Sequence, residues 1–395
     1  MPQNKKPLSE KKEPSAKANK EPSAKPGYHD SAEHVLNTDG FKTSGLKANK
    51  SINVKNVGSY QVQQNSSLTA QFELEKEKAA RIRELLESLH PGWAAPEGAD
   101  FTGASLINQD LERMRFNSSP MRYCKFKSSK LRGVHWKNCD LRGVDFRHAD
   151  LRDCILDGCN LNGADLRHAN LTNARIIDTD LSAANFDHTV LDTAIIENCD
   201  MVAQTFHNSS CREIRLYNSQ IIHGFFDNAD FTKSEIQDME FRHCTLTKTS
   251  FNNADISNTS FKGCESFDEG PSFSHARINE VTMTDCDLQS VNMVSTQLTG
   301  CLWERVNLTD AQLDNTVFNQ VNFSEGSFTD CFSIEKAPTF NHCRLDHLVI
   351  EHTDLTNALF TKSLFIGAVI RDSDFEEWHL EQTAVDAETI IEVYE

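Results

Sequence analysis

Cysteine is the side chain in this sequence whose spacing best tests for metal or redox chemistry. Twelve cysteines occur in 395 residues, and no pair has the CxxC spacing of a zinc or redox site. Cys264 and Cys331 would occupy the same position as most of the other cysteines if the sequence pattern ran on through two interruptions. Cys211 replaces a bulky apolar residue. We therefore predict that the cysteines are small core residues with free thiols, as a reducing compartment favours. The majority stand two residues before a bulky apolar residue: Cys124, Cys139, Cys154, Cys159, Cys199, Cys244, Cys286, Cys301 and Cys343.

Histidine gives a second candidate for chemistry. His148, His168 and His188 stand twenty residues apart. A metal-binding or pH-sensitive ladder is one hypothesis, but a linear row lacks the convergent ligands that metal sites need. The alternative is that repeated units place exposed rings one above another. No Ser/His/Asp or Cys/His arrangement and no GxxxxGKS loop is present. We predict no catalytic residue, no metal and no cofactor, and hence no enzyme.

The apolar residues have a period of five. In CNLNGADLRHANLTNARII (159–177), Leu161, Leu166, Leu171 and Ile176 are five apart, which fits neither a helix nor an ordinary strand. From position 101 to 261 there are 33 positions at this spacing, and 32 hold Leu, Ile, Met, Phe or Trp. Such a long repeat determines the architecture.

Each five-residue unit reads small, Asp or Asn, Leu or Phe, polar, polar. If each unit turns the chain by about a right angle, four units close a square coil of twenty residues. Successive coils then pair as parallel strands about 4.8 Å apart. Bulky residues twenty apart should stack inside the tube, for example Phe126, Phe146, Leu166, Phe186 and Phe206.

This unit resembles the pentapeptide-repeat family, A(D/N)Lxx, over residues 99–382. The resemblance implies an all-β fold, a right-handed quadrilateral parallel β-helix. A helical pattern before it places Phe72, Ala79, Ile82, Leu86 and Leu89 on one face, which suits a cap. The predicted domains are a disordered tail and possible secretion leader (1–67), the capping helix (68–92), the β-helix (93–383) with register slips at 262–272 and 329–339, and a C-terminal cap with a short helix (384–395).

Charge is distributed unevenly along the chain. Residues 98–175 carry 13 basic and 9 acidic side chains, whereas residues 176–395 carry 12 and 37, within a total formal charge of −18. A solvated surface explains part of this asymmetry. We predict in addition that basic columns on the first coils bind an acidic partner. The candidate partner-binding residues are Lys127, Arg147 and Arg167 in one column and Arg132 and Arg152 in another.

Three functions fit this organisation. The tail ahead of a repeat domain resembles the layout of pentapeptide-repeat effectors of type III secretion, which implies export from a bacterial cytoplasm into a host cell. The acidic coils resemble DNA-mimicking proteins that protect gyrase. Similar β-helices also precede the catalytic lobe of effector ubiquitin ligases, although no such lobe fits within this sequence. We favour the first hypothesis, a non-enzymatic scaffold that binds a host protein or membrane-associated partner.

Several expectations follow for partners. We expect a protein partner and no direct nucleic-acid binding. No apolar run of 18 residues occurs, so we expect no transmembrane segment. Peripheral membrane association and the oligomeric state are left open.

Overall fold

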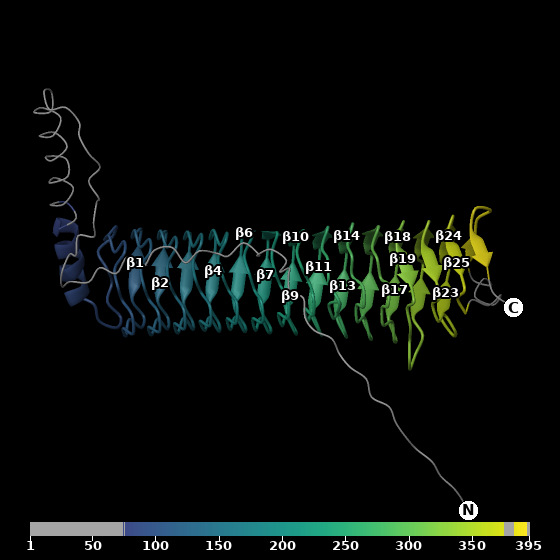
Figure 1. Ribbon diagram of the computed structural model, residues 1–395, viewed down its shortest axis with the longest axis horizontal. Coiled ribbons are helices and arrows are strands. Elements are labelled where there is room, and N and C mark those ends of the chain that lie inside the picture. Colours follow the sequence, from purple (N-terminus) through teal and green to yellow (C-terminus); the bar gives the residue numbers. More distant parts are fainter. Residues whose placement is uncertain (1–73, 75, 375–382, 393–395) are drawn as a thin grey trace, which may run out of the picture. The chain divides into compact units, whose positions relative to one another are not determined.

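The computed structural model describes residues 74, 76–374 and 383–392, and from residue 93 onward these form stacked coils (Figure 1). Thirteen successive coils each contribute one strand to the longest sheet, and every strand pair is parallel. This sheet is the first face of the β-helix. Its strands are β1 (Arg115–Asn117), β2 (His135–Lys137), β3 (Ile155–Asp157), β4 (Arg175–Ile177), β5 (Ile195–Glu197), β7 (Arg215–Tyr217), β9 (Glu235–Gln237), β11 (Asp255–Ser257), β13 (Arg277–Asn279), β15 (Gln297–Thr299), β17 (Val317–Asn319), β20 (Thr339–Asn341) and β23 (Leu359–Thr361).

Three further faces complete each coil. A 10-stranded sheet forms the second face, and a 4-stranded sheet forms the C-terminal part of the third. Isolated bridges continue the third face toward the N-terminus, as in Ser105 to Lys125, and form the fourth face, as in Asp110 to Lys130. The second face contains β6 (Asp200–Val202), β8 (Gln220–Ile222), β10 (Glu240–Arg242), β12 (Ser260–Lys262), β14 (Thr282–Thr284), β16 (Leu302–Glu304), β18 (Asn322–Ser324), β21 (Arg344–Asp346), β24 (Leu364–Ile366) and β26 (Ala384–Val385), and the third contains β19 (Ser327–Thr329), β22 (Val349–Glu351), β25 (Val369–Arg371) and β27 (Ile390–Glu392).

The strand register follows the repeat. Phe116 pairs with Trp136, and Trp136 pairs with Leu156, each twenty residues further along. Across the two slips the partners are twenty-two residues apart, as in Ile256 with Ile278 and Phe318 with Phe340. The two extra residues are therefore absorbed in loops, and the ladder continues. The predicted fold class, a quadrilateral parallel β-helix, is confirmed.

The core fills the inside of the coils. Leu161, Leu166, Leu171 and Ile176 are each 0% exposed, and the small residues two positions earlier are buried with them. Aromatic rings stack along the axis, with Phe186 and Phe206 centroids 4.8 Å apart. Burying each bulky side chain contributes about 2 kcal/mol, which makes this core the main source of stability.

The second recurring feature of each unit closes its turn. The second residue after each buried centre takes a left-handed conformation, with φ of 59° at His168 and 62° at Asn173. The Asp or Asn before the centre accepts a hydrogen bond from the backbone N–H two residues on: Asn170 Oδ1 lies 3.0 Å from Thr172 N. The polar half of the motif is therefore a turn device, as short Asx side chains commonly are.

The two ends differ in part from the sequence predictions. A helix spans 76–87, and Ile82, Leu85, Leu86 and Leu89 pack against the core, whereas Ala79 is exposed. The predicted start of this helix, with Phe72, and the predicted disordered tail 1–67 lie outside the described residues.

The prediction of a short helix within residues 384–395 is wrong. β26 pairs with β24 and β27 pairs with β25, so two strands extend the β-helix beyond residue 383. The last coil would otherwise leave the backbone N–H and C=O groups at the edges of β24 and β25 unpaired, and strands at 384–385 and 390–392 pair with them. In the described part of the chain, no helix has the length and apolar character needed to cross a bilayer.

Candidate partner-binding surface

The structure places the five predicted partner-binding residues in two neighbouring columns. Ser128 N donates to Arg147 O at 2.9 Å and His148 N donates to Arg167 O at 3.1 Å, which sets Lys127, Arg147 and Arg167 in register on the third face. Gly133 N donates to Arg152 O at 2.8 Å, which places Arg132 beside Arg152 on the fourth face. The columns exist, and their role in binding stays a prediction.

Four of the five cations are engaged by carboxylates. Arg147 donates to both oxygens of Asp145, at 2.9 and 2.8 Å. Arg167 pairs with Asp165 and Arg152 with Asp150 in the same bidentate way. The Arg152 guanidinium holds the pKa of Asp150 below its usual value. Arg132 donates to Asp153 of the next coil at 2.9 Å.

Lysine differs from arginine in this respect. Among the described residues, Lys127 and its neighbour Lys125 have no ion-pair partner within 4 Å. Lys125 is exposed and Lys127 is half-buried, and the two flank the buried Phe126. The positive charge that remains available on the third face therefore lies on these two lysines, and sequence reasoning had singled out only Lys127.

The histidine ladder forms as expected. The rings of His148 and His168 are 4.8 Å apart and nearly parallel, and His168 and His188 are 4.9 Å apart. Desolvation and the two neighbouring imidazoles lower the pKa of His168. No cluster of three or more His, Cys, Asp or Glu side chains suited to a metal occurs in the part of the chain that the structure describes.

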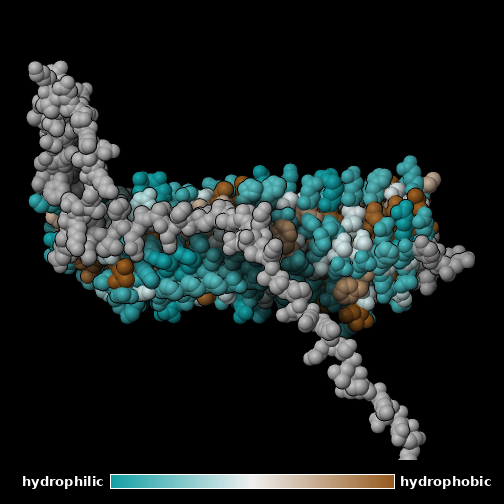
Figure 2. All heavy atoms as spheres, in the orientation of Figure 1, coloured by the Kyte–Doolittle hydropathy of each residue, from teal (hydrophilic) through white to brown (hydrophobic). Residues whose placement is uncertain are grey.

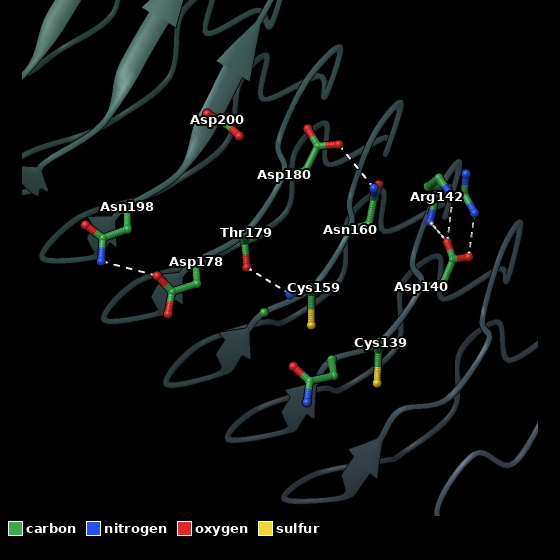
Figure 3. A pocket seen from close by; sticks show the side chains of 12 residues that line it. Cys139, Asp140, Arg142, Cys159, Asn160, Asp178, Thr179, Asp180, Asn198 and Asp200 are labelled. Carbon is green, nitrogen blue, oxygen red and sulfur yellow. Dashed lines mark hydrogen bonds and ion pairs between the residues drawn. The ribbon is translucent and has the colours of Figure 1, made fainter.

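A polar groove runs along the corner between the first and second faces (Figure 3). Its volume is about 540 Å³, and its amides and carboxylates hydrogen-bond across coils. Asn198 donates to Asp178 at 3.2 Å, and Asn160 donates to Asp180 at 3.1 Å (Figure 3). These side chains satisfy one another along the ladder, so the groove has the character of a solvated surface.

The thiols beside this groove, Cys139 and Cys159, are buried, and their interaction lowers the pKa of Cys139 and raises that of Cys159. The Sγ atoms of Cys139 and Cys159 lie 3.5 Å from the carbonyl oxygens of Phe116 and Trp136. All twelve cysteines are free and buried. Burial raises the pKa of Cys154 and of Cys211 to about 12, which leaves almost no thiolate near neutral pH.

The repeat matches known family models. The pentapeptide repeat region model matches residues 97–166 and 129–206, and the model of pentapeptide repeats (8 copies) matches 226–263 and 272–302. Residues 97–206, 226–263 and 272–302 are therefore pentapeptide repeats. The comparison with curated proteins gave no match.

Several solved structures are similar to this chain. HetL, a pentapeptide repeat protein involved in heterocyst differentiation regulation from the cyanobacterium Nostoc sp. strain PCC 7120, is 19% identical over 60% of this chain and 92% of its own, with a TM-score of 0.30. QnrB1, a plasmid-mediated fluoroquinolone resistance protein, is 23% identical over 43% and 80%, with a TM-score of 0.23. A mannuronic acid specific polysaccharide family 6 lyase from human gut microbiota is 11% identical over 79% and 89%, with a TM-score of 0.31.

Proposed function

We propose that this chain is a non-enzymatic scaffold that binds a protein partner through the outer surface of its β-helix. One observation carries the proposal: the motif's own carboxylates are used in turn closure and in pairing with neighbouring arginines, as at Asp145 and Asp150. What the fold presents outward is a set of parallel side-chain columns in steps of about 4.8 Å. The face shown in Figure 2 is largely hydrophilic, with isolated hydrophobic side chains. Such surfaces suit extended recognition.

The partner can be sought by chemical crosslinking of the full chain, followed by affinity measurement with the purified partner. We expect Lys125→Glu/Lys127→Glu to weaken binding. Lys233→Glu is the matched control, because Lys233 is an outward lysine that pairs with Glu213 and lies several coils away from Lys125 and Lys127. A full chain that crosslinks to no protein, while turning over a substrate, would overturn the scaffold proposal.

We further propose that the protein is a bacterial effector secreted into a host cell. The support is the sequence composition of residues 1–67, a Lys-, Ser- and Asn-rich segment ahead of the repeats. A reporter enzyme fused to this segment should enter host cells in a secretion-dependent manner. Equal reporter activity from a secretion-deficient strain would contradict this.

A second candidate function rests on the acidic coils. Residues 176–395 carry 12 basic and 37 acidic side chains, and columns such as Asp180 and Asp200 repeat them along the axis. DNA also carries closely spaced charges along its axis, one per about 1.7 Å. If these coils mimic DNA, the full chain should inhibit gyrase in a supercoiling assay. Unchanged supercoiling at saturating protein would exclude this alternative.

A further inference from the structure

An apolar and cationic patch lies on the first coils. We define the Tyr123 patch as Ile107, Tyr123, Lys125 and Lys127. Tyr123 is 66% exposed at the corner where the second face meets the third, and Ile107 is 37% exposed. Backbone hydrogen bonds from Leu106 N to Lys125 O (2.8 Å) and from Asn108 N to Lys127 O (3.0 Å) place Ile107 in the coil directly below the lysines.

Tyr123 has a backbone conformation that is unfavourable for a bulky residue. Its φ is 59°, in the left-handed region that Asn, Asp and Gly adopt more readily than a bulky residue. Its ring lies against Gly143 of the next coil: a Cβ atom added to Gly143 would be only 2.7 Å from two carbons of the Tyr123 ring. The ring is thus supported by the coil, and most of the residue faces solvent. Exposed aromatic side chains held in one orientation are typical anchors of protein interfaces.

The surroundings of Tyr123 carry net positive charge. Arg122 and Arg142 share a single carboxylate, Asp140. Asp145, the carboxylate next to Lys125 in the ladder, is already held by Arg147. Lys125 and Lys127 have no ion-pair partner among the described residues. This charge is balanced most readily by anionic groups of a partner.

We propose that the Tyr123 patch binds an acidic peptide segment of the protein partner, with an apolar side chain seated between Tyr123 and Ile107. Lys125 lies in the ladder and Lys127 begins the turn that follows, so their Cα atoms are at most about 7 Å apart. Carboxylates at alternate positions of an extended peptide have a similar separation. The peptide's acidic residues then face the two lysines, and its apolar residue covers the aromatic ring. This inference rests on the proposed scaffold function.

Selection from random peptides displayed on phage, with the immobilised full chain, tests the proposal. We expect enriched peptides with two acidic residues at alternate positions next to an aromatic or aliphatic residue. Tyr123→Asn should lower the affinity for the selected peptides at least about tenfold, as loss of an interface anchor does. The same substitution should leave the melting temperature equal or higher, because Asn tolerates the left-handed conformation better. Lys125→Glu/Lys127→Glu should abolish binding, and Lys233→Glu should not affect it.

Three results would overturn the proposal. The first is an enriched set without acidic residues, and the second is equal affinity for Tyr123→Asn and the native chain. The third is binding of phosphatidylserine vesicles through the same residues in place of any peptide, which would make the surface a membrane site. If Tyr123→Asn binds the protein partner with native affinity, this inference is wrong, while the proposed scaffold function stands.

Discussion

Arg142 and Asp140 form a bidentate ion pair within one repeat unit, with Nε 2.8 Å from Oδ1 and Nη2 2.8 Å from Oδ2. The same two-residue spacing pairs Arg147 with Asp145 and Arg167 with Asp165. In each case the carboxylate that accepts from the turn backbone also neutralises the arginine. The basic columns of the first coils are therefore largely columns of ion pairs.

This pairing predicts sensitivity to acid. The guanidinium of Arg142, with help from Arg122, lowers the pKa of Asp140 from 3.8 to about 2. A carboxyl whose folded pKa is depressed contributes stability above its unfolded pKa and loses it as pH falls toward the folded value. Thermal midpoints followed by circular dichroism should fall between pH 4 and 2 more steeply for the native chain than for Asp140→Asn. Parallel curves would show that this pair does not contribute.

The core predicts a contrast between inward and outward positions. Leu171 is 0% exposed, and its truncation in Leu171→Ala should cost about 2–5 kcal/mol in the free energy of unfolding. Asn162→Ala, at an exposed position, should change it by less than about 0.5 kcal/mol. Urea denaturation measures both. Similar losses for the two variants would contradict the assignment of inward and outward residues.

One buried amide predicts a stabilising substitution. Gln204 is 0% exposed, and neither its Nε2 nor its Oε1 has a hydrogen-bond partner among the residues that the structure describes. Gly224 of the next coil leaves room for it, since a Cβ there would lie 3.2 Å from Gln204 Nε2. Gln204→Met keeps the volume and removes the unpaired polar atoms, so it should raise stability by about 1 kcal/mol or more. A lower melting temperature would indicate that the amide has a partner, such as a buried water.

The cysteines predict an inert protein toward thiol reagents. All twelve are buried, and burial raises the pKa of Cys124 and Cys199 to about 12. We expect no rapid reaction with Ellman's reagent in the folded state and twelve reactive thiols in guanidinium chloride. A fast-reacting thiol in the native protein would reveal an accessible cysteine and reopen a redox role.

The fold could be predicted because each unit decides locally which side chains point inward. Period five at Leu161, Leu166 and Leu171 is enough to specify a coil, whatever lies elsewhere in the chain. The sequence alone could not show that the predicted C-terminal helix is wrong. Its residues become strands because β24 and β25 present open edges, and because Asp386 accepts hydrogen bonds from Gly367 N and Thr389 N, both at 3.0 Å.

The candidate surface was predicted less well than the fold. Residue spacing placed Lys127, Arg147 and Arg167 in one column, but it did not show which charges are neutralised. The Asp-x-Arg spacing was a usable signal, since both side chains point outward from one turn. Tyr123 was missed although the repeat places it at an outward position, since the contact of its ring with Gly143 one coil away is visible only in the structure.

The most direct test is the affinity of the full chain for its crosslinked protein partner at several salt concentrations. If unpaired cations of the first coils carry binding, Lys125→Glu/Lys127→Glu should abolish it with an unchanged melting temperature. Salt should weaken the native complex, since exposed charges are screened beyond about 8–10 Å. Native affinity in the double variant, with no salt dependence, would contradict the account and direct attention to the acidic coils after residue 176.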